Sequence, residues 1–204
     1  MKIKEIQVKE QLGATDIFFP IPAALIVCGT IENANIITIA WIGIAGSNPP
    51  IISISVKKSR FSLELIRKWG EFTVNIPSAD YFKETDYCGI VSGKNTDKFT
   101  DTGLTPLKSK KINVPIIKEC PYNLECKKVK EVEFGDYRVI FGEIVENHID
   151  SDKIDKNNKE INIKKVNPLV YCARIREYWD LGEKIGNGFK AGKEILKNVK
   201  MDKP

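Results

Sequence analysis

The first third of the chain alternates short apolar runs with turn-forming residues, a pattern typical of β-strands. Runs rich in Ile, Val and Thr, bounded by Gly, Asn and Pro, predict strands over 24–31, 36–43 and 51–57. In the third run, Ser53 and Ser55 stand between Ile and Val residues. A period of two places these hydroxyls on one face of the strand and the apolar side chains on the other.

Helical spacing follows this strand. Apolar residues recur every three or four positions from Phe61 to Trp69, and Gly70 ends the pattern, so a helix is predicted over 59–70. The next run, 71–76, returns to the strand pattern.

A second helix is predicted over 80–91, with Tyr81, Thr85 and Cys88 on one face. The turn formers of 92–99 then predict a loop. Cys88 is either a redox thiol or a packing residue, and a lone cysteine on a helical face favours packing.

The second half resumes the strand pattern. Two antiparallel strands, 124–132 and 137–149, are expected to join at a turn around Gly135. The charged run 150–165 predicts an exposed loop or hairpin, and 168–175 predicts a last strand.

The strands are mostly connected as hairpins, and the alternation of strand and helix typical of a parallel sheet is missing. This pattern favours a mainly β fold, a closed antiparallel barrel with peripheral helices. We expect a single domain over 1–204, with a barrel core over about 15–175 and a tail over about 180–200. Apolar spacing predicts an amphipathic helix in that tail, from 180 to about 199.

One stretch, 33–56, carries no charged residue and approaches the ~20 apolar residues of a membrane-spanning helix. Pro49 and Pro50 interrupt it, and two prolines would remove backbone donors inside a bilayer. Buried strands joined by a proline turn explain the stretch better, so we expect no membrane association.

The composition excludes several kinds of active site. The only histidine, His148, cannot build a zinc site of several histidines, and no GxSxG motif supplies a serine nucleophile. Five cysteines without a CxxC pair argue against zinc ribbons and iron–sulfur clusters. We therefore expect no metal and no catalytic acid or base, and we expect His148 to be an ordinary surface residue.

The net charge is small, +5 from 32 basic and 27 acidic residues. Residues 1–102 carry equal numbers of each sign, so the excess lies in the second half. Such a surplus fits a solvated surface better than a nucleic-acid partner. The first residues form no apolar leader, and the free thiols favour a cytoplasmic protein.

A candidate anion site lies where the third strand meets the first helix. Hydroxyls and cations gather there, and helix N–H groups favour negative charge. This combination suits a phosphate monoester. The alternative is a solvated strand end followed by an ordinary capped helix. The residues concerned are Ser53, Ser55, Lys57, Ser59, Arg60 and Ser62.

The uncharged run 35–41 offers a flat apolar surface on which a planar heterocycle could lie. The alternative is a core strand whose Trp41 fills the interior.

The order of segments along the chain is specific. A proline-rich lead precedes three segments, ALIVCGT, NIITIAW and SNPPIISISVKKSRFS. Three more segments follow, and they are GEFTVNIP, DYCGIVSGKNTDKF and EYWDLGEKIGNGF. This series, over about 15–192, resembles the flavin reductase-like family of FMN-binding split barrels, which includes flavoredoxins and related ferric or flavin reductases. The resemblance implies a six-stranded Greek-key barrel that binds FMN, usually as a homodimer with the flavin near the subunit interface.

The resemblance also implies site residues. The strand along the isoalloxazine ring would contribute Thr38, Ile39, Ala40 and Trp41. The phosphate would be held by Ser55, Lys57, Ser59, Arg60 and Ser62. Asn75 would lie beside the flavin. A loop that closes over the cofactor would contribute Ser92, Gly93, Lys94 and Lys98. The C-terminal motif is matched by Tyr178 and Gly182.

The function that follows from this resemblance is an FMN-dependent oxidoreductase. Electrons would pass from NADH or NADPH through bound FMN to free flavin, ferric iron or another acceptor. One alternative is a flavoredoxin-type electron carrier that serves a redox partner protein. Another is a binding barrel without flavin.

Overall fold

Residues 35–47 close the β-sheet into a barrel, because this stretch pairs with both ends of the sheet. In the computed structural model, which describes residues 9–193 and residue 195, β3 (Asn35–Ile39) pairs with β2 (Ala24–Cys28). Two residues later, β4 (Ile42–Ser47) pairs with β5 (Pro50–Lys57). The single strand predicted over 36–43 is therefore wrong, because the chain changes its pairing partner at Ala40 and Trp41.

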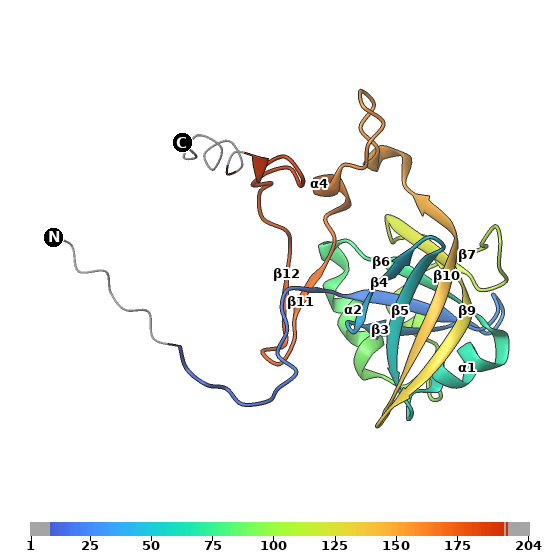
Figure 1. The fold of residues 1–204 in the computed structure, drawn as a ribbon. Coiled ribbons are helices and arrows are strands. Elements are labelled where there is room, and N and C mark those ends of the chain that lie inside the picture. The colour runs from blue at the N-terminus through green and yellow to red at the C-terminus, as the bar shows by residue number, and fades with distance from the viewer. Residues whose placement is uncertain (1–8, 194, 196–204) are drawn as a thin grey trace, which may run out of the picture.

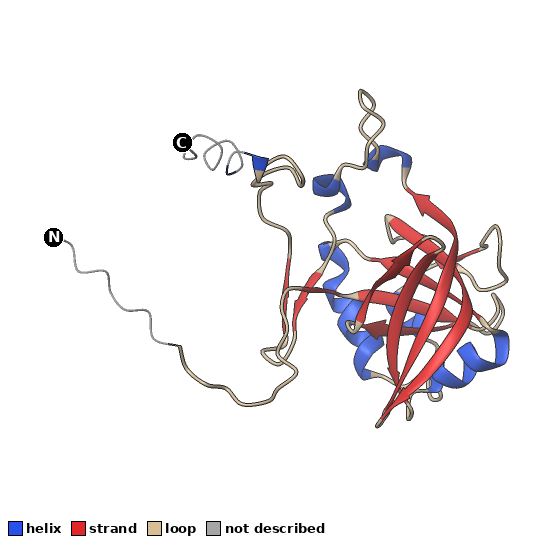
Figure 2. Ribbon diagram, in the orientation of Figure 1, coloured by secondary structure: helices blue, strands red, loops and turns tan. Residues whose placement is uncertain are grey.

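The sheet order is β3-β2-β6-β9-β10-β5-β4, and every pairing in it is antiparallel (Figure 2). When residues 35–47 are counted as one bent strand, the barrel has the six strands that were predicted. The remaining strands of this sheet are β6 (Glu71–Ile76), β9 (Tyr122–Phe134) and β10 (Tyr137–Ile149).

Three helices lie beside the barrel (Figure 1). They are α1 (Phe61–Trp69), α2 (Phe82–Ile90) and α3 (Lys98–Thr102), and a short 3₁₀ turn, η1 (Ala79–Tyr81), leads into α2. Gly70 ends α1 with φ of 67°, a left-handed conformation that glycine adopts without steric cost.

The structure differs from the predicted helices in two details. Trp69 belongs to the apolar pattern that predicts helix α1, but it is 42% exposed, whereas Leu63 and Ile66 of the same helix are buried. The loop predicted over 92–99 ends early, because the Asp97 side chain accepts from two backbone N–H groups and starts α3 at Lys98.

The apolar side chains form two cores. One fills the barrel and includes Ile26, Ile54 and Phe72. The second lies between the barrel and the helices and includes Cys88, which is fully buried. Burial raises the pKa of the Cys88 thiol to about 12, so the thiol is protonated at neutral pH. Its position agrees with the packing role that was favoured.

The last part of the chain adds a small sheet of order β1-β11-β12 beside the barrel (Figure 1). The charged run 150–165 forms a hairpin closed by a bridge between Ile154 and Ile161. The elements not yet named are β1 (Ile21–Pro22), β7 (Pro106–Leu107), β8 (Ile116–Ile117), η2 (Ser151–Lys153), α4 (Ile163–Val166), β11 (Val170–Cys172) and β12 (Glu177–Trp179).

The tail helix predicted from 180 to about 199 is wrong over 180–192, which contains no helix. Each glycine inside a helix costs about 1 kcal/mol relative to alanine, and this segment holds Gly182, Gly186, Gly188 and Gly192. Residues 194 and 196–199 of the prediction lie outside the described part of the chain. Within that part, no helix has both the length and the apolar character needed to cross a membrane.

His148 is not the ordinary surface residue that was predicted. Its side chain is only 20% exposed, and its Nε2 lies 2.6 Å from Oε1 of the fully buried Glu125. The Glu125 carboxylate also accepts from the backbone N–H groups of Lys110 and Lys111 at 2.7 and 2.6 Å. Burial opposes the charged form, but these donors outweigh it and lower the pKa of Glu125.

Replacing Glu125 with Gln should lower the free energy of unfolding by about 2–4 kcal/mol at neutral pH, because an amide would face donors that now share a carboxylate. The contribution of Glu125 to the free energy of unfolding is fully present above the ordinary pKa of glutamate. It is lost as the pH falls through the lower pKa of Glu125 in the folded state. Denaturant unfolding at neutral and acid pH should show the difference shrinking in acid. Glu146→Gln on the neighbouring strand is the control, and equal effects of the two changes would contradict this role.

Candidate functional site

The junction between β5 and α1 exposes helix N–H groups next to cations. Lys57 ends β5, and the N–H of Arg60 donates to its carbonyl at 3.0 Å, forming a tight turn. Arg60 is the residue before the first turn of α1, and no side chain of the described chain caps that helix. The ordinary capped helix considered as an alternative is therefore absent there. Free N–H groups at this end favour an anion.

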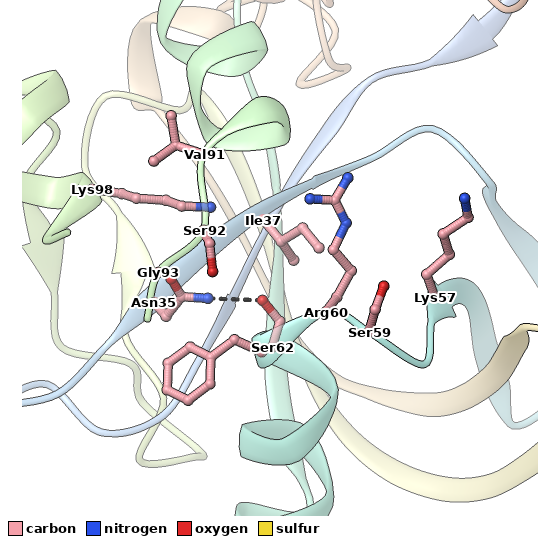
Figure 3. Close-up of a pocket in the computed structure, with 11 residues that line it drawn as sticks. Asn35, Ile37, Lys57, Ser59, Arg60, Ser62, Val91, Ser92, Gly93 and Lys98 are labelled. Carbon is pink, nitrogen blue, oxygen red and sulfur yellow. Dashed lines mark hydrogen bonds between the residues drawn. The ribbon is translucent and has the colours of Figure 1, made fainter. Parts of the chain in front are cut away.

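A buried amide holds the neighbouring loop against this junction. Asn35, at the start of β3, donates from Nδ2 to Oγ of Ser62 at 2.7 Å (Figure 3). Gly93 packs so closely on Asn35 that a Cβ at position 93 would lie 1.8 Å from Oδ1. Only glycine fits that approach, so the loop after α2 is fixed beside the start of α1.

Lys98 approaches the same place from α3, opposite Arg60 and Lys57 (Figure 3). It is 4% exposed, and its Nζ donates to the carbonyls of Ile36 and Cys88, each at 2.7 Å. Burial lowers the pKa of the Lys98 ammonium, and the charge on Arg60 adds to this effect.

These groups surround a hollow of about 260 Å³. Three cationic side chains and three serines line it, and none of the described lining residues is acidic. The charge therefore selects an anion. The lining consists of Asn35, Ile37, Lys57, Ser59, Arg60, Phe61, Ser62, Val91, Ser92, Gly93 and Lys98.

A second hollow, of about 310 Å³, shares Ile37, Lys57 and Arg60 with the first, so the two adjoin. Its floor is the stretch where the chain leaves β3, and Trp41 there is 46% exposed instead of filling the interior. The alternative is right that residues 35–39 form a largely buried core strand, and it is wrong that Trp41 fills the interior. The full lining adds Ala23, Thr38, Ile39, Ala40, Trp41, Ser55, Asp86, Gly89, Ile90, Tyr137, Tyr171 and Tyr178.

Tyrosines form much of the wall of this second hollow. The rings of Tyr171 and Tyr178 lie 5.1 Å apart, and the Tyr178 hydroxyl donates to Oδ1 of Asp86 at 3.1 Å. Burial, together with the charge of Asp86, raises the pKa of Tyr178. On the other side, Lys57 Nζ lies 5.7 Å from the centre of the Tyr137 ring. An aromatic wall above an uncharged floor suits a planar ring.

Most of the predicted site residues line these hollows; the exceptions are Ser53, Asn75, Lys94 and Gly182. Ser55, predicted at the phosphate, lines only the second hollow. Ser53 donates from Oγ to the carbonyl of Gly43 at 3.2 Å. Lys94 pairs with Glu64 at 3.1 Å on the surface. Asn75 is fully buried and uses its whole amide inside the fold, accepting from the backbone N–H of Ile117 at 2.9 Å and donating to the carbonyl of Leu25 at 3.0 Å.

Several lining residues were not predicted, and they come from elements far apart in the chain. Asp86 and Gly89 lie on α2, and Tyr171 comes from β11. Asn35 carried a signal, because a polar amide opens an apolar strand in the sequence. Gly89 carried none, because its close approach to Thr38, with a Cβ there 3.3 Å from Cβ of Thr38, depends on how α2 packs on β3.

The structure is a closed antiparallel barrel with a cationic junction beside an uncharged platform. The family model for the flavin reductase like domain matches residues 17–180, and the chain belongs to that family.

Three solved structures are similar. Flavoredoxin of Desulfovibrio vulgaris (Miyazaki F) is 34% identical with a TM-score of 0.86, covering 91% of this chain and 100% of that one. Flavoredoxin from Methanosarcina acetivorans is 30% identical with a TM-score of 0.81, covering 95% and 100%. A split barrel protein of Shewanella frigidimarina, at 21% identity and a TM-score of 0.73, covers 82% and 85% and shares the fold.

Replacing Asn75 with Ala should lower the free energy of unfolding by about 2–4 kcal/mol, because it leaves buried N–H and carbonyl groups without partners. Chemical denaturation measures this loss. Asn147→Ala removes an exposed amide and should change the free energy of unfolding by less than about 0.5 kcal/mol. A small effect at Asn75 would contradict its role in the fold.

Proposed function

We propose that the protein is an FMN-dependent oxidoreductase that takes electrons from NADH or NADPH and passes them to free flavin, ferric iron or another acceptor. The observation that carries this proposal is the depression formed by two adjoining hollows, whose two ends differ in chemistry. One end is cationic and rich in hydroxyl groups, and the other is an uncharged platform with an aromatic wall. FMN has the same two parts, a phosphate and a planar ring.

The residues at the cationic end fit the phosphate. Lys57, Arg60 and Lys98 supply positive charge, and Ser59, Ser62 and Ser92 add hydroxyl donors. The uncapped start of α1 lies among them and favours the same charge. Lys94 and Asn75 belong to no part of this binding set.

The residues at the other end fit the ring. Thr38, Ile39, Ala40 and Trp41 would lie beneath it, and Tyr178 would stand at its side. FMN bound there supplies hydride and electron transfer at its isoalloxazine ring. The protein binds this ring, orients it and leaves part of its surface open to a second molecule.

A second candidate function is electron carriage between partner proteins, which the similarity to two flavoredoxins favours. Steady-state oxidation of NADH or NADPH separates the two functions, because a carrier has little activity without its redox partner protein. We place either function in the cytoplasm.

The proposal includes a homodimer. Segments 9–20 and 180–193 leave the barrel (Figure 1), and their side chains Phe18, Ile185 and Phe189 are largely exposed to solvent. Apolar side chains on extended segments are usually covered by another chain, and a second copy would cover them here.

The purified protein should bind FMN and show a two-banded flavin absorption spectrum. Arg60→Gln should weaken FMN binding by about tenfold or more, because a charge-assisted contact at the helix start is lost. Arg67→Gln is a matched control, since Arg67 lies at the other end of α1 and pairs with Glu131.

Equilibrium titration followed by absorption or fluorescence measures both affinities. Absence of flavin binding by the unaltered protein would refute the proposed function. Equal affinity of the two variants would place the phosphate elsewhere.

A further inference from the structure

A single carboxylate, that of Asp86 on α2, stands in the wall of the second hollow. Among the described residues that line the two hollows, no other side chain is acidic. Lys57 and Arg60 also reach the second hollow, but they are shared with the cationic one. The depression is therefore polar along its length, with cations gathered at one end and a carboxylate in the wall of the other.

The fold holds the Asp86 carboxylate at this place. Its Oδ1 accepts a hydrogen bond from the Tyr178 hydroxyl at 3.1 Å, which joins α2 to β12 of the small sheet (Figure 1). Tyr178 is itself fixed against the ring of Tyr171, 5.1 Å away. Within the described part of the chain, no basic side chain lies within ion-pair distance of Asp86. The carboxylate thus keeps its charge and has a neutral partner only.

A ligand at the cationic end would make Asp86 the unbalanced charge of the ring end. A phosphate monoester carries about −1.5 to −2 charges at pH 7, and in the proposed function it lies against Lys57 and Arg60. The positive charge that these two side chains add to the second hollow is then offset. A second molecule that lies against the flavin ring would meet a negative charge in the wall beside it, and like charges repel.

We propose that Asp86 is a specificity-determining residue of the ring end. It makes this end prefer a second molecule that is neutral or positive where it meets the flavin over one that is negative there. This inference rests on the proposed function, because it takes the second hollow as the place of the ring. A nicotinamide ring meets the requirement, since it is neutral when reduced and positive once oxidised. Among electron acceptors, a neutral quinone or flavin ring meets it and an anionic ferric chelate does not.

A purely structural role is the competing explanation, because the bond to Tyr178 joins α2 to β12. Asp86→Asn separates the two roles, since the amide oxygen still accepts from the tyrosine hydroxyl while the charge is lost. Asp86→Glu keeps the charge. Glu84→Gln is the matched control, because Glu84 lies on the same helix and lines neither hollow.

The test compares two planar quinones of similar shape, neutral menadione and anionic 1,4-naphthoquinone-2-sulfonate. Their dissociation constants from the oxidised, FMN-loaded protein are measured through the change in the flavin absorption bands. Asp86→Asn should lower the preference for menadione by about two- to fivefold, the range for an exposed charge. Asp86→Glu and Glu84→Gln should leave it unchanged. At 1 M salt, where the screening length is about 3 Å, the difference between Asp86→Asn and the unaltered protein should vanish.

Reoxidation of the chemically reduced protein gives a second readout that needs no nicotinamide. The quinone takes up two electrons from the reduced flavin, together with two protons, and becomes a hydroquinone, while the flavin returns to its oxidised form. The ratio of the second-order rate constants for menadione and the sulfonate should fall in Asp86→Asn by the same two- to fivefold, again at low salt only.

Two results would overturn the inference while leaving the proposed function intact. One is a preference in Asp86→Asn that equals that of the unaltered protein at low salt. The other is an equal shift in Glu84→Gln, which would show that any charge on α2 acts in this way. If the unaltered protein binds no FMN, the proposed function fails. The same quinones, followed by tryptophan fluorescence of the flavin-free protein, then still test the charge of Asp86, because Trp41 lines the same hollow.

Discussion

Backbone pairing of residues 35–47 determines both the barrel and the site. The first half of this stretch, β3, pairs with β2, and the second half, β4, pairs with β5 at the other end of the sheet. This change of partner closes the barrel and leaves fewer backbone N–H and carbonyl groups unpaired at an open edge. The change takes place at Ala40 and Trp41, which are left outside regular pairing. Closing the barrel thus brings the uncharged platform beside the end of β5, where Lys57 begins the cationic junction. The two ends of the depression are neighbours for that reason.

Electrostatics then distinguishes the two ends. The junction gathers cations around an uncapped helix start, while the carboxylates near it are occupied elsewhere, as Glu64 is by Lys94. Asn35 and Gly93 hold the loop that brings Lys98 into this group. Positive charge that the fold does not balance is costly, and a bound anion offsets the cost. A site of this kind suits a cofactor that arrives with its own negative charge.

The sequence predicted what depends on local order. Of the serines and cations predicted from Ser53 to Ser62, those from Lys57 onward line the cationic hollow, because a strand end and a helix start follow each other directly in the chain. Ser53 and Ser55 do not line it, because they lie farther back along β5. Asp86 and Tyr171 could not be identified in this way, because their approach depends on how α2 and β11 pack on the barrel. Asn75 shows a different limit of prediction from sequence. A family motif placed it beside the flavin, but the motif does not tell which way a strand side chain points, and the Asn75 side chain points into the fold. The bend at Ala40 and Trp41 was hidden for a related reason, since apolar residues continue through it unbroken.

In the proposed oxidoreductase, the depression binds FMN so that a reduced nicotinamide can donate electrons to it. The most direct measurement is the absorption spectrum of the FMN-loaded protein before and after NADH or NADPH is added in the absence of air. One of the two nucleotides should bleach the flavin bands within the mixing and observation time. A flavin that stays oxidised with both nucleotides, yet is bleached by a chemical reductant, would contradict the oxidoreductase assignment.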